Sequence, residues 1–404
     1  MFKAIGIISE YNPFHNGHLH QIETVKQKFP DRPIICLMSG NFVQRGEPAI
    51  WNKFIRARAA LICGADMVIE LPVVFATASA EFFSHYALSL LNALGCVDYL
   101  CFGTEAGEHG ILEEVAKALV NEGYSFKAEL KARLAMGYSY PAARQAALEY
   151  LLPDTRDVLD KPNNILGIEY IKAIMRIDSN IKPFAIKRQG EGYHSGDHSK
   201  KLSSAKAIRA ALRDGQASLA GIPDILVPFY KEHIESKDFH NYERLSPVLE
   251  YMVKTRSPEY LADILDIDEG LQNRIIEAFG REQLISKSLL RLKSKRYTYT
   301  KLQRALLHIL LDITKKDFAQ LNASAPHYIR VLGFRKKWEC LFKAIESSTS
   351  IPIVTNIKNY RTTLTNSALK LMEKEIISTD IYNLASLKAH PKNAEFSEQI
   401  VVLK

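Results

Sequence analysis

The sequence predicts an α/β protein: a Rossmann-like, doubly wound parallel sheet followed by an all-helical domain. Two observations lead to this prediction. Short apolar runs alternate with amphipathic segments through the first hundred residues, and from about residue 226 onward the apolar residues follow the helical period. Strands that alternate with helices favour a parallel sheet covered on both faces, because right-handed crossovers place helices on each face in turn.

The elements of the sheet are expected in strict order along the chain. The apolar runs predict strands at 4–9, 33–39, 66–72, 96–103 and 181–188, and the amphipathic runs predict helices at 17–28, 52–64 and 79–95. Pro72 closes the third strand, and Gly64 and Gly95 end the two later helices. We expect a sheet domain at 1–222 with a helical insertion at about 105–160, a helical domain at 226–370, and a C-terminal segment at 371–404.

The composition is that of a globular protein. Of the 404 residues, 47% are hydrophobic and 24% charged, which is enough apolar material for a sizeable core. The net charge of +8 suits a polyanionic partner such as nucleic acid, and equally a mildly basic enzyme. The five cysteines form no CxxC pair, so we expect free thiols in a reducing compartment. No signal peptide and no apolar run of membrane-spanning length is present, which predicts a cytoplasmic protein.

A cluster of histidines follows the first strand, in the stretch "EYNPFHNGHLH". His15 and His18 flank Gly17 where a strand end meets a helix N-terminus. Such an N-terminus binds phosphate readily, and Gly17 lets the backbone approach a ligand closely. The two imidazoles can then donate hydrogen bonds to phosphate oxygens. A zinc site would need further ligands, and an Asn-Gly turn would not explain both histidines.

Further strand ends and helix starts contribute candidates to the same crevice. Ser203 or Ser204 would cap a helix that carries Arg209 one turn in, and Arg188 ends the last strand. Gly103 lies in a loop that could pass under an adenine or ribose. Asn163 either caps the helix that follows it or donates its amide to the nucleotide. After the second strand, we expect three cations to make that edge of the crevice basic: Arg45, Lys53 and Arg56.

The helical domain contains a basic, aromatic stretch at 285–304. Its seven cations are accompanied by no acid, and two tyrosines lie among them. Unpaired cations of this kind meet phosphates, and tyrosines can stack on unpaired bases, whereas a solvated helix face would normally mix charge signs. We therefore expect RNA contact, with the candidates Lys293, Lys295, Arg296, Tyr297, Lys301 and Arg304.

The motifs together resemble a known family. "GIISEYNPFHNGHLHQ", "MSGNFVQRGEPA", "GADMVIELP", "KPNNILGIEY" and "SSAKAIR" are similar to blocks of the bacterial tRNA(Met) cytidine acetate ligase family, and "HNGH" to the HxGH signature of the nucleotidyltransferase superfamily. The resemblance implies a nucleotidyltransferase fold and a ligase that forms acetyl-adenylate from ATP and acetate, with Mg²⁺ beside the phosphates. The acetyl group then passes to N4 of the wobble cytidine of elongator tRNA(Met), and AMP is released.

The same resemblance assigns roles to residues. It implies catalytic roles for His15, His18 and Arg209. With the loops described above, it implies ATP contacts at Ile7, Ser9, Glu10, Tyr11, Asn12, Pro13, Phe14, Asn16, Gly17, His20, Gly103, Asn163, Arg188, Ser203 and Ser204. We expect no metal ligands among the side chains. Two alternatives stay open at this point: a small-molecule adenylyltransferase, and an ATP-sensing RNA-binding protein without turnover.

Overall fold

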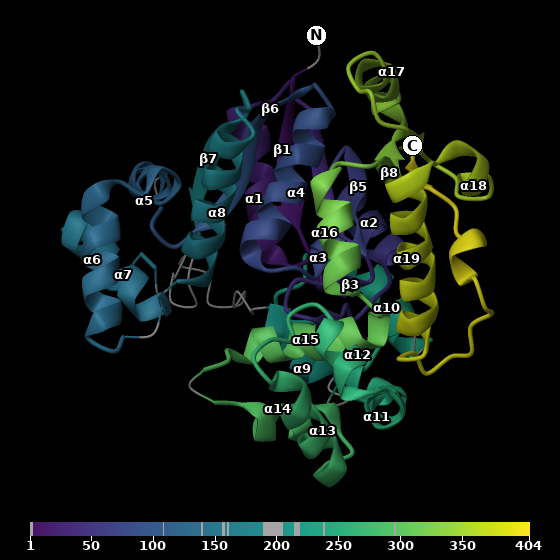
Figure 1. Cartoon of the computed structure of the whole chain (residues 1–404). Coiled ribbons are helices and arrows are strands. Elements are labelled where there is room, and N and C mark those ends of the chain that lie inside the picture. Colours follow the sequence, from purple (N-terminus) through teal and green to yellow (C-terminus); the bar gives the residue numbers. More distant parts are fainter. Residues whose placement is uncertain are drawn as a thin grey trace.

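One mixed sheet forms the centre of the molecule (Figure 1). The computed structural model describes residues 3–107, 109–138, 140–155, 158–159, 161–188, 205–213, 219–236, 239–294 and 296–404. Within them the strand order is β10-β8-β5-β2-β1-β6-β7, and β9 pairs with β8. The strands are β1 Ala4–Ser9, β2 Ile34–Ser39, β5 Met67–Leu71, β6 Val97–Thr104, β7 Lys182–Lys187, β8 Ile329–Arg335, β9 Ile353–Val354 and β10 Val401–Leu403.

The parallel part of the sheet confirms the predicted strands. Strand β1 lies in the middle, parallel to β2 on one side and to β6 on the other, and β5 and β7 extend the two wings. The sequence of β1 is "AIGIIS", in which small residues let neighbours pack closely. A side chain added at Gly6 would stand 3.1 Å from Leu91 of the helix above it. Because strand order reverses at β1, a crevice is expected beyond its carboxyl end.

Helices cover both faces of this sheet. One face carries α1 Asn16–Lys28, α2 Lys53–Ile62, α9 Ala205–Arg213 and α10 Val227–Glu235, and the other carries α3 Val73–Ala76, α4 Ala80–Ala93 and α8 Pro162–Arg176. Beyond the β7 wing lies the predicted helical insertion, α5 Gly110–Asn121, α6 Tyr124–Ala135 and α7 Tyr140–Leu151 (Figure 1).

The second half of the chain is helical only in part. Five helices pack near the carboxyl ends of the strands (Figure 1): α11 Ser246–Thr255, α12 Pro258–Asp263, α13 Leu271–Arg281, α14 Ile285–Leu292 and α15 Tyr299–Leu311. A sixth, α16 Lys315–Ala323, packs through Phe318 against α3 and α4. The prediction of an all-helical segment at 226–370 is wrong at β8, which joins the sheet antiparallel to β5. Strand β10 from the C-terminal segment then pairs parallel to β8. Two short helices, α17 Cys340–Glu346 and α18 Tyr360–Thr363, and the long helix α19 Asn366–Asn383 complete this half.

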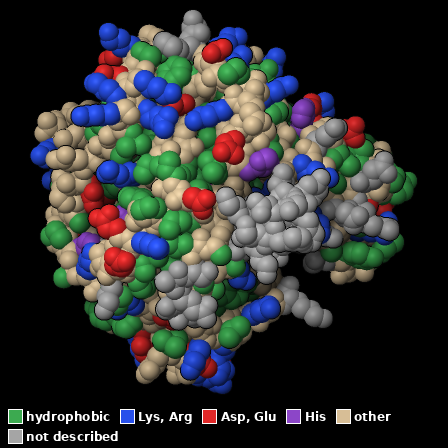
Figure 2. Space-filling model, turned by 180° about the vertical axis from the view of Figure 1, so that it is seen from behind, with side chains coloured by type: hydrophobic (Ala, Val, Ile, Leu, Met, Phe, Trp, Pro, Cys, Tyr) green, Lys and Arg blue, Asp and Glu red, His purple; other side chains and the backbone are tan. Residues whose placement is uncertain are grey.

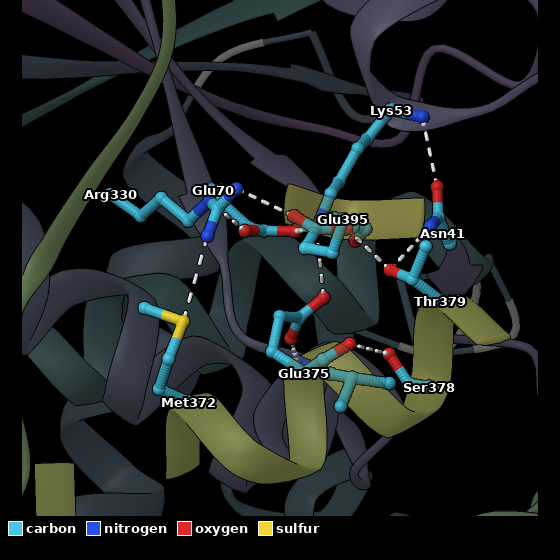
Figure 3. A network of polar contacts seen from close by, with 12 residues as sticks. Asn41, Lys53, Glu70, Arg330, Met372, Glu375, Ser378, Thr379 and Glu395 are labelled. Carbon is cyan, nitrogen blue, oxygen red and sulfur yellow. Dashed lines mark hydrogen bonds and ion pairs between the residues drawn. The ribbon is translucent and has the colours of Figure 1, made fainter. Parts of the chain in front are cut away.

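A buried ion network joins α2 and α19 to the strands β5 and β8 (Figure 3). Lys53 of α2 is fully buried, and its Nζ lies 2.6 Å from Glu70 and 2.7 Å from Glu395. Arg330 of β8 pairs with the same two carboxylates, and Glu375 of α19 lies 3.4 Å from Lys53. Charges can be buried only when they are paired in this way. The network therefore requires all these segments to fold together.

The charge on the surface and the lengths of the helices agree with the net charge and the apolar content of the sequence. From the rear, Lys and Arg side chains outnumber Asp and Glu on the upper part of the surface (Figure 2). None of the helices in the described part of the chain has the length and apolar content needed to cross a membrane.

Candidate nucleotide-binding site

The two histidines of "HNGH" form a capping box at the start of α1. His15 is the N-cap residue, and its Nδ1 accepts a hydrogen bond of 3.0 Å from the backbone N–H of Gly17. His18, three residues on, accepts a bond of 3.3 Å at its own Nδ1 from the backbone N–H of His15. The spacing of the two histidines is thus the spacing of a capping box, with imidazoles in place of Ser and Glu.

These bonds set the protonation of both rings. Since Nδ1 is an acceptor in each ring, the proton of the neutral imidazole is assigned to Nε2. Burial lowers the pKa of His15 to about 4, with the charges of Arg188 and Arg209 adding to the effect. Burial first, and then His15 and Arg188, hold the pKa of His18 well below its ordinary value. The rings stack with centroids 3.8 Å apart, so two neutral Nε2–H donors lie side by side.

A cleft opens beside this pair, toward β6 and β7. Gly103 at the end of β6 lies on one side and the start of α1 on the other. The lining includes two cations, Lys187 and Arg188, at the end of β7. Among the described residues, no carboxylate pairs with Arg188. The cleft is lined by His15, Gly17, His18, His20, Gln21, Gly103, Ile186, Lys187 and Arg188. Neutral donors, cations and a helix N-terminus together favour an anion such as phosphate.

Arg209 reaches the same strand end from α9. Its Nη1 donates to the carbonyl oxygen of Asn12 at 2.7 Å, and its Nη2 pairs with Glu47 at 2.7 Å. The side chain is only 11% exposed. Arg209 therefore fixes the backbone just before the histidines, and its charge helps to keep His15 neutral. Ser203 and Ser204, predicted to cap this helix, lie outside the described residues.

Asn163 and Asn164, which follow Pro162, have a structural role. The sequence had suggested either a helix cap or an amide contact to the nucleotide. Both residues lie inside α8, whose N-cap is Lys161. Asn163 donates to Glu105 at 2.5 Å. Asn164 is buried, and its Oδ1 accepts from the Thr104 hydroxyl at 2.6 Å and from the backbone of Glu105 at 2.9 Å. The pair holds the loop after β6, and so the position of Gly103.

Several predicted ATP contacts are core residues. Ile7, Tyr11 and Phe14 are buried, and they belong to the hydrophobic cluster between the sheet and α1. Tyr11 contacts the ring of His18 edge-on at 4.9 Å, and Phe14 contacts it at 5.4 Å. These side chains support the histidines from behind.

The remaining predicted contacts lie in the backbone between β1 and α1. Ser9 ends β1. Asn12 accepts a hydrogen bond at Oδ1 from the backbone N–H of Ile50, and a cis peptide bond joins it to Pro13. Asn16 donates its backbone N–H to the carbonyl oxygen of Gly221.

The expected basic edge after β2 is wrong for two of its three cations. Lys53 belongs to the buried network, and Arg56 is equally buried. Arg56 donates to the carbonyl oxygens of Glu10 at 2.6 Å and Ser39 at 3.0 Å, and also to that of Gly40. It thus joins the ends of β1 and β2. Only Arg45 is exposed.

The basic stretch of the helical domain, residues 285–304, also differs from the prediction. Its cations were expected to be unpaired, but acids from the preceding turns pair with four of them: Arg291 with Glu282, Arg296 with Glu269, Lys301 with Asp268, and Arg304 with Asp266. Tyr297 is 5% exposed, packed beneath Arg296 and Lys301, so a base cannot stack on its ring. Lys287 and Lys293 are exposed. Among the described residues, neither has a carboxylate partner. Lys295 lies outside those residues.

The sequence of this chain is similar to those of known proteins. The model of the family described as HIGH Nucleotidyl Transferase matches residues 2–397. A protein named tRNA(Met) cytidine acetate ligase from Halothermothrix orenii is 40% identical over 94% of both chains. Another of the same name, from Acetivibrio thermocellus, is 37% identical over 99% of this chain and 100% of that one.

Two crystal structures of Thermotoga maritima TmcAL are similar over the full length of both chains. The form bound with α-thio ATP is 31% identical in sequence, with a TM-score of 0.91. The apo form is 30% identical, with a TM-score of 0.92. The similarity covers the sheet and the helical part alike.

Proposed function

This chain belongs to the HIGH nucleotidyl transferase family and, within it, to the tRNA(Met) cytidine acetate ligases, and on that premise we propose its reaction. It activates acetate with ATP as acetyl-adenylate and transfers the acetyl group to N4 of the wobble cytidine of elongator tRNA(Met). The observation that carries the proposal is the pair of neutral Nε2–H donors at the N-terminus of α1, beside a cleft lined by cations.

The first step is a displacement at phosphorus. A carboxylate oxygen of acetate attacks the α-phosphorus, the bond from that phosphorus to the bridging oxygen breaks, and pyrophosphate leaves with the electron pair. Negative charge grows on the phosphate oxygens as this happens. His15 and His18 donate to those oxygens through Nε2, while Arg188 and Lys187 neutralise the charge. Gly17 and Gly103 leave room for the nucleotide on both sides.

The neutral state of the histidines suits this task. A neutral imidazole donates one hydrogen bond at a fixed position and needs no proton from solvent. The capping box holds both rings before ATP arrives, so little reorganisation is needed during the reaction. The lowered pKa of His15, about 4, keeps the ring in this state at every physiological pH.

The second step is acyl transfer. The amine N4 of cytosine attacks the carbonyl carbon of acetyl-adenylate, the carbon–oxygen bond to the phosphate breaks, and AMP departs. A wobble base lies in a single-stranded loop, so it can enter a pocket without melting a duplex. We propose that Lys287 and Lys293, both exposed, contribute to tRNA binding, and that the enzyme acts in the cytoplasm.

We further propose that Mg²⁺ accompanies ATP, held by the phosphate oxygens. In the described part of the chain, no three His, Cys, Asp or Glu side chains cluster so that they could hold a metal ion. The side chains of the described residues therefore do not by themselves form a site for a cation. Magnesium commonly binds with substrate phosphates and keeps several waters.

Two assays test the reaction. Exchange of labelled pyrophosphate into ATP should require acetate, and mass spectrometry of tRNA incubated with ATP and labelled acetate should find the label on one cytidine. If free dinucleotides form without tRNA, the protein is a small-molecule adenylyltransferase. If no pyrophosphate is released with acetate and tRNA both present, it binds ATP and RNA without turnover.

A further inference from the structure

A small hairpin lies across the carboxyl end of the sheet, between the nucleotide cleft and the helical domain. It consists of β3 Phe42–Val43 and β4 Glu47–Pro48, joined by a turn. On one side, Oε1 of Glu47 forms an ion pair of 2.7 Å with Nη2 of Arg209. On the other, the backbone of Gly46 packs against α15, where a Cβ would stand 2.6 Å from the backbone nitrogen of Arg304. The hairpin is therefore fixed from both sides.

Glu10, at the end of β1, is turned toward this hairpin. Its Oε1 accepts a bond of 3.0 Å from the backbone N–H of Gln44. Its other oxygen, Oε2, has no hydrogen-bond partner among the described residues. The cleft that contains the histidines lies toward β6 and β7, and it is not lined by Glu10. The hairpin follows β2, which lies on the opposite side of β1. Glu10 thus faces the hairpin, whereas the cleft with the histidines opens toward the other side of β1.

The chemistry of this place fits a cytosine. The pairing edge of cytosine has an N4 amine that donates, and N3 and O2 atoms that accept. A carboxylate accepts well from the N4 amine, and a guanidinium donates well to N3 and O2. Glu10 supplies a carboxylate oxygen, and Arg45, exposed in the hairpin turn, is close enough to act on the charge of Glu10. Uracil would instead present its O4 acceptor to the carboxylate, and the two would repel.

We propose that Glu10 and Arg45 hold the pairing edge of the acceptor cytosine, and that the Glu10 carboxylate takes the proton from N4 during acetyl transfer. This inference rests on the proposed function. The bond from N4 to the acetyl carbon forms, the bond from that carbon to the AMP oxygen breaks, and AMP keeps the electron pair. The N4 proton passes to Oε2 of Glu10 and then to solvent. Glu10, which the sequence predicted as an ATP contact, is thereby assigned to the binding of the acceptor cytosine.

The surroundings of Glu10 strengthen it as a base. Burial raises the pKa of its carboxyl, while the Gln44 N–H and two arginines oppose the rise only in part. Groups from four elements face it and set its titration: Arg45 and Glu47 of the hairpin, Arg209 of α9, Tyr170 of α8, and Arg56 of α2, which also bonds its carbonyl oxygen. A general base contributes about 10²- to 10⁴-fold to such a step.

The test separates the two half-reactions in E10Q and in E250Q, the latter a control at a half-buried carboxyl of α11 that pairs with the exposed Lys254. Single-turnover transfer from preformed acetyl-adenylate to tRNA should fall about 100-fold or more in E10Q, whereas acetate-dependent pyrophosphate exchange should fall less than about tenfold. The wild-type transfer rate should fall on acidification at a pH above 4.5, where an ordinary glutamate titrates, and E10Q should lack this fall.

Other outcomes overturn the inference. An equal loss in both half-reactions would place Glu10 in adenylation, and unchanged transfer would remove it from the reaction. A wild-type protein without acetate-dependent exchange would instead contradict the proposed function itself. As a separate readout, tRNA with uridine at the acceptor position should compete at least about tenfold more weakly than the cytidine form against wild type, and E10Q should reduce this difference. Equal competition against the wild type would refute recognition by Glu10.

Discussion

The capping box of histidines allows their structural and chemical roles to be separated by substitution. Each ring uses Nδ1 to hold the start of α1 and leaves Nε2 for the ligand. His15→Asn keeps an acceptor at the N-cap, where Asn is among the best residues. His18→Gln keeps an acceptor at the third helical position, where Gln completes a capping box. Both variants retain the cap and lose the imidazole Nε2–H.

The expected magnitudes follow from these two functions. A lost N-cap bond costs about 0.5–2 kcal/mol of stability, so His15→Ala and His18→Ala should each lose an amount in that range. His15→Asn and His18→Gln should remain within about 0.5 kcal/mol of the wild type. The removal of one donor to an anionic transition state costs about 10²- to 10³-fold in rate. All four variants should therefore lose pyrophosphate exchange by about that factor.

Urea titration followed by circular dichroism gives the free energy of unfolding, and acetate-dependent pyrophosphate exchange gives the rate. The conservative variants should keep the wild-type free energy of unfolding and lose the exchange rate. If His18→Gln exchanged pyrophosphate at the wild-type rate, the ring would serve only as a cap. If His15→Asn were as unstable as His15→Ala, the hydrogen bond from Gly17 would not be what holds the helix start.

Three further predictions concern stability and RNA binding. His15 is protonated near pH 6.5 in the unfolded chain and only near pH 4 in the folded chain, so the free energy of unfolding should fall as the pH drops from 6.5 to 4. The fall should reach up to about 3 kcal/mol in the wild type and be smaller in His15→Asn, as measured by urea titration at several pH values. Lys53→Met leaves Glu70 and Glu395 with Arg330 alone and removes the cation beside buried Glu375, and should cost about 3–5 kcal/mol. Lys254→Ala, at a partly exposed surface pair with Glu250, should cost about 0.5 kcal/mol or less. The double variant Lys287→Ala/Lys293→Ala should weaken tRNA binding and lower the log–log salt slope by about 2 in filter binding, while pyrophosphate exchange is retained.

Contrary results would be informative in each case. Equal urea midpoints at pH 5 and 7 would mean that His15 is not buried as a neutral ring. A loss at Lys53 no larger than at Lys254 would mean that the network carries no net stability. An unchanged salt slope would move the tRNA contact away from α14.

Strands β2 and β5 could be predicted because their apolar runs are buried throughout and bounded by Gly or Pro. Strand β1 has the predicted bounds, Ala4–Ser9. Strand β8 was missed, although "YIRVLGFR" is an apolar run rich in branched residues, because helical patterns on either side outweighed it. Its partner β5 lies far away in sequence, and no local pattern reports such a pairing. The same holds for Asn164, whose role depends on the loop after β6.

The roles of charged side chains are harder to predict from the sequence than the burial of apolar ones. Apolar residues are buried almost wherever they form a periodic run, but the effect of a cation depends on what faces it in space. The stretch 285–304 contains no acid, yet the turn before α13 brings Asp266, Asp268 and Glu269 against it. Lys53 is likewise ordinary in sequence and fully buried in the structure. A cation can therefore be assigned to a phosphate only after its carboxylate neighbours are known, which leaves Arg188 and Lys187 as the strongest candidates at the nucleotide.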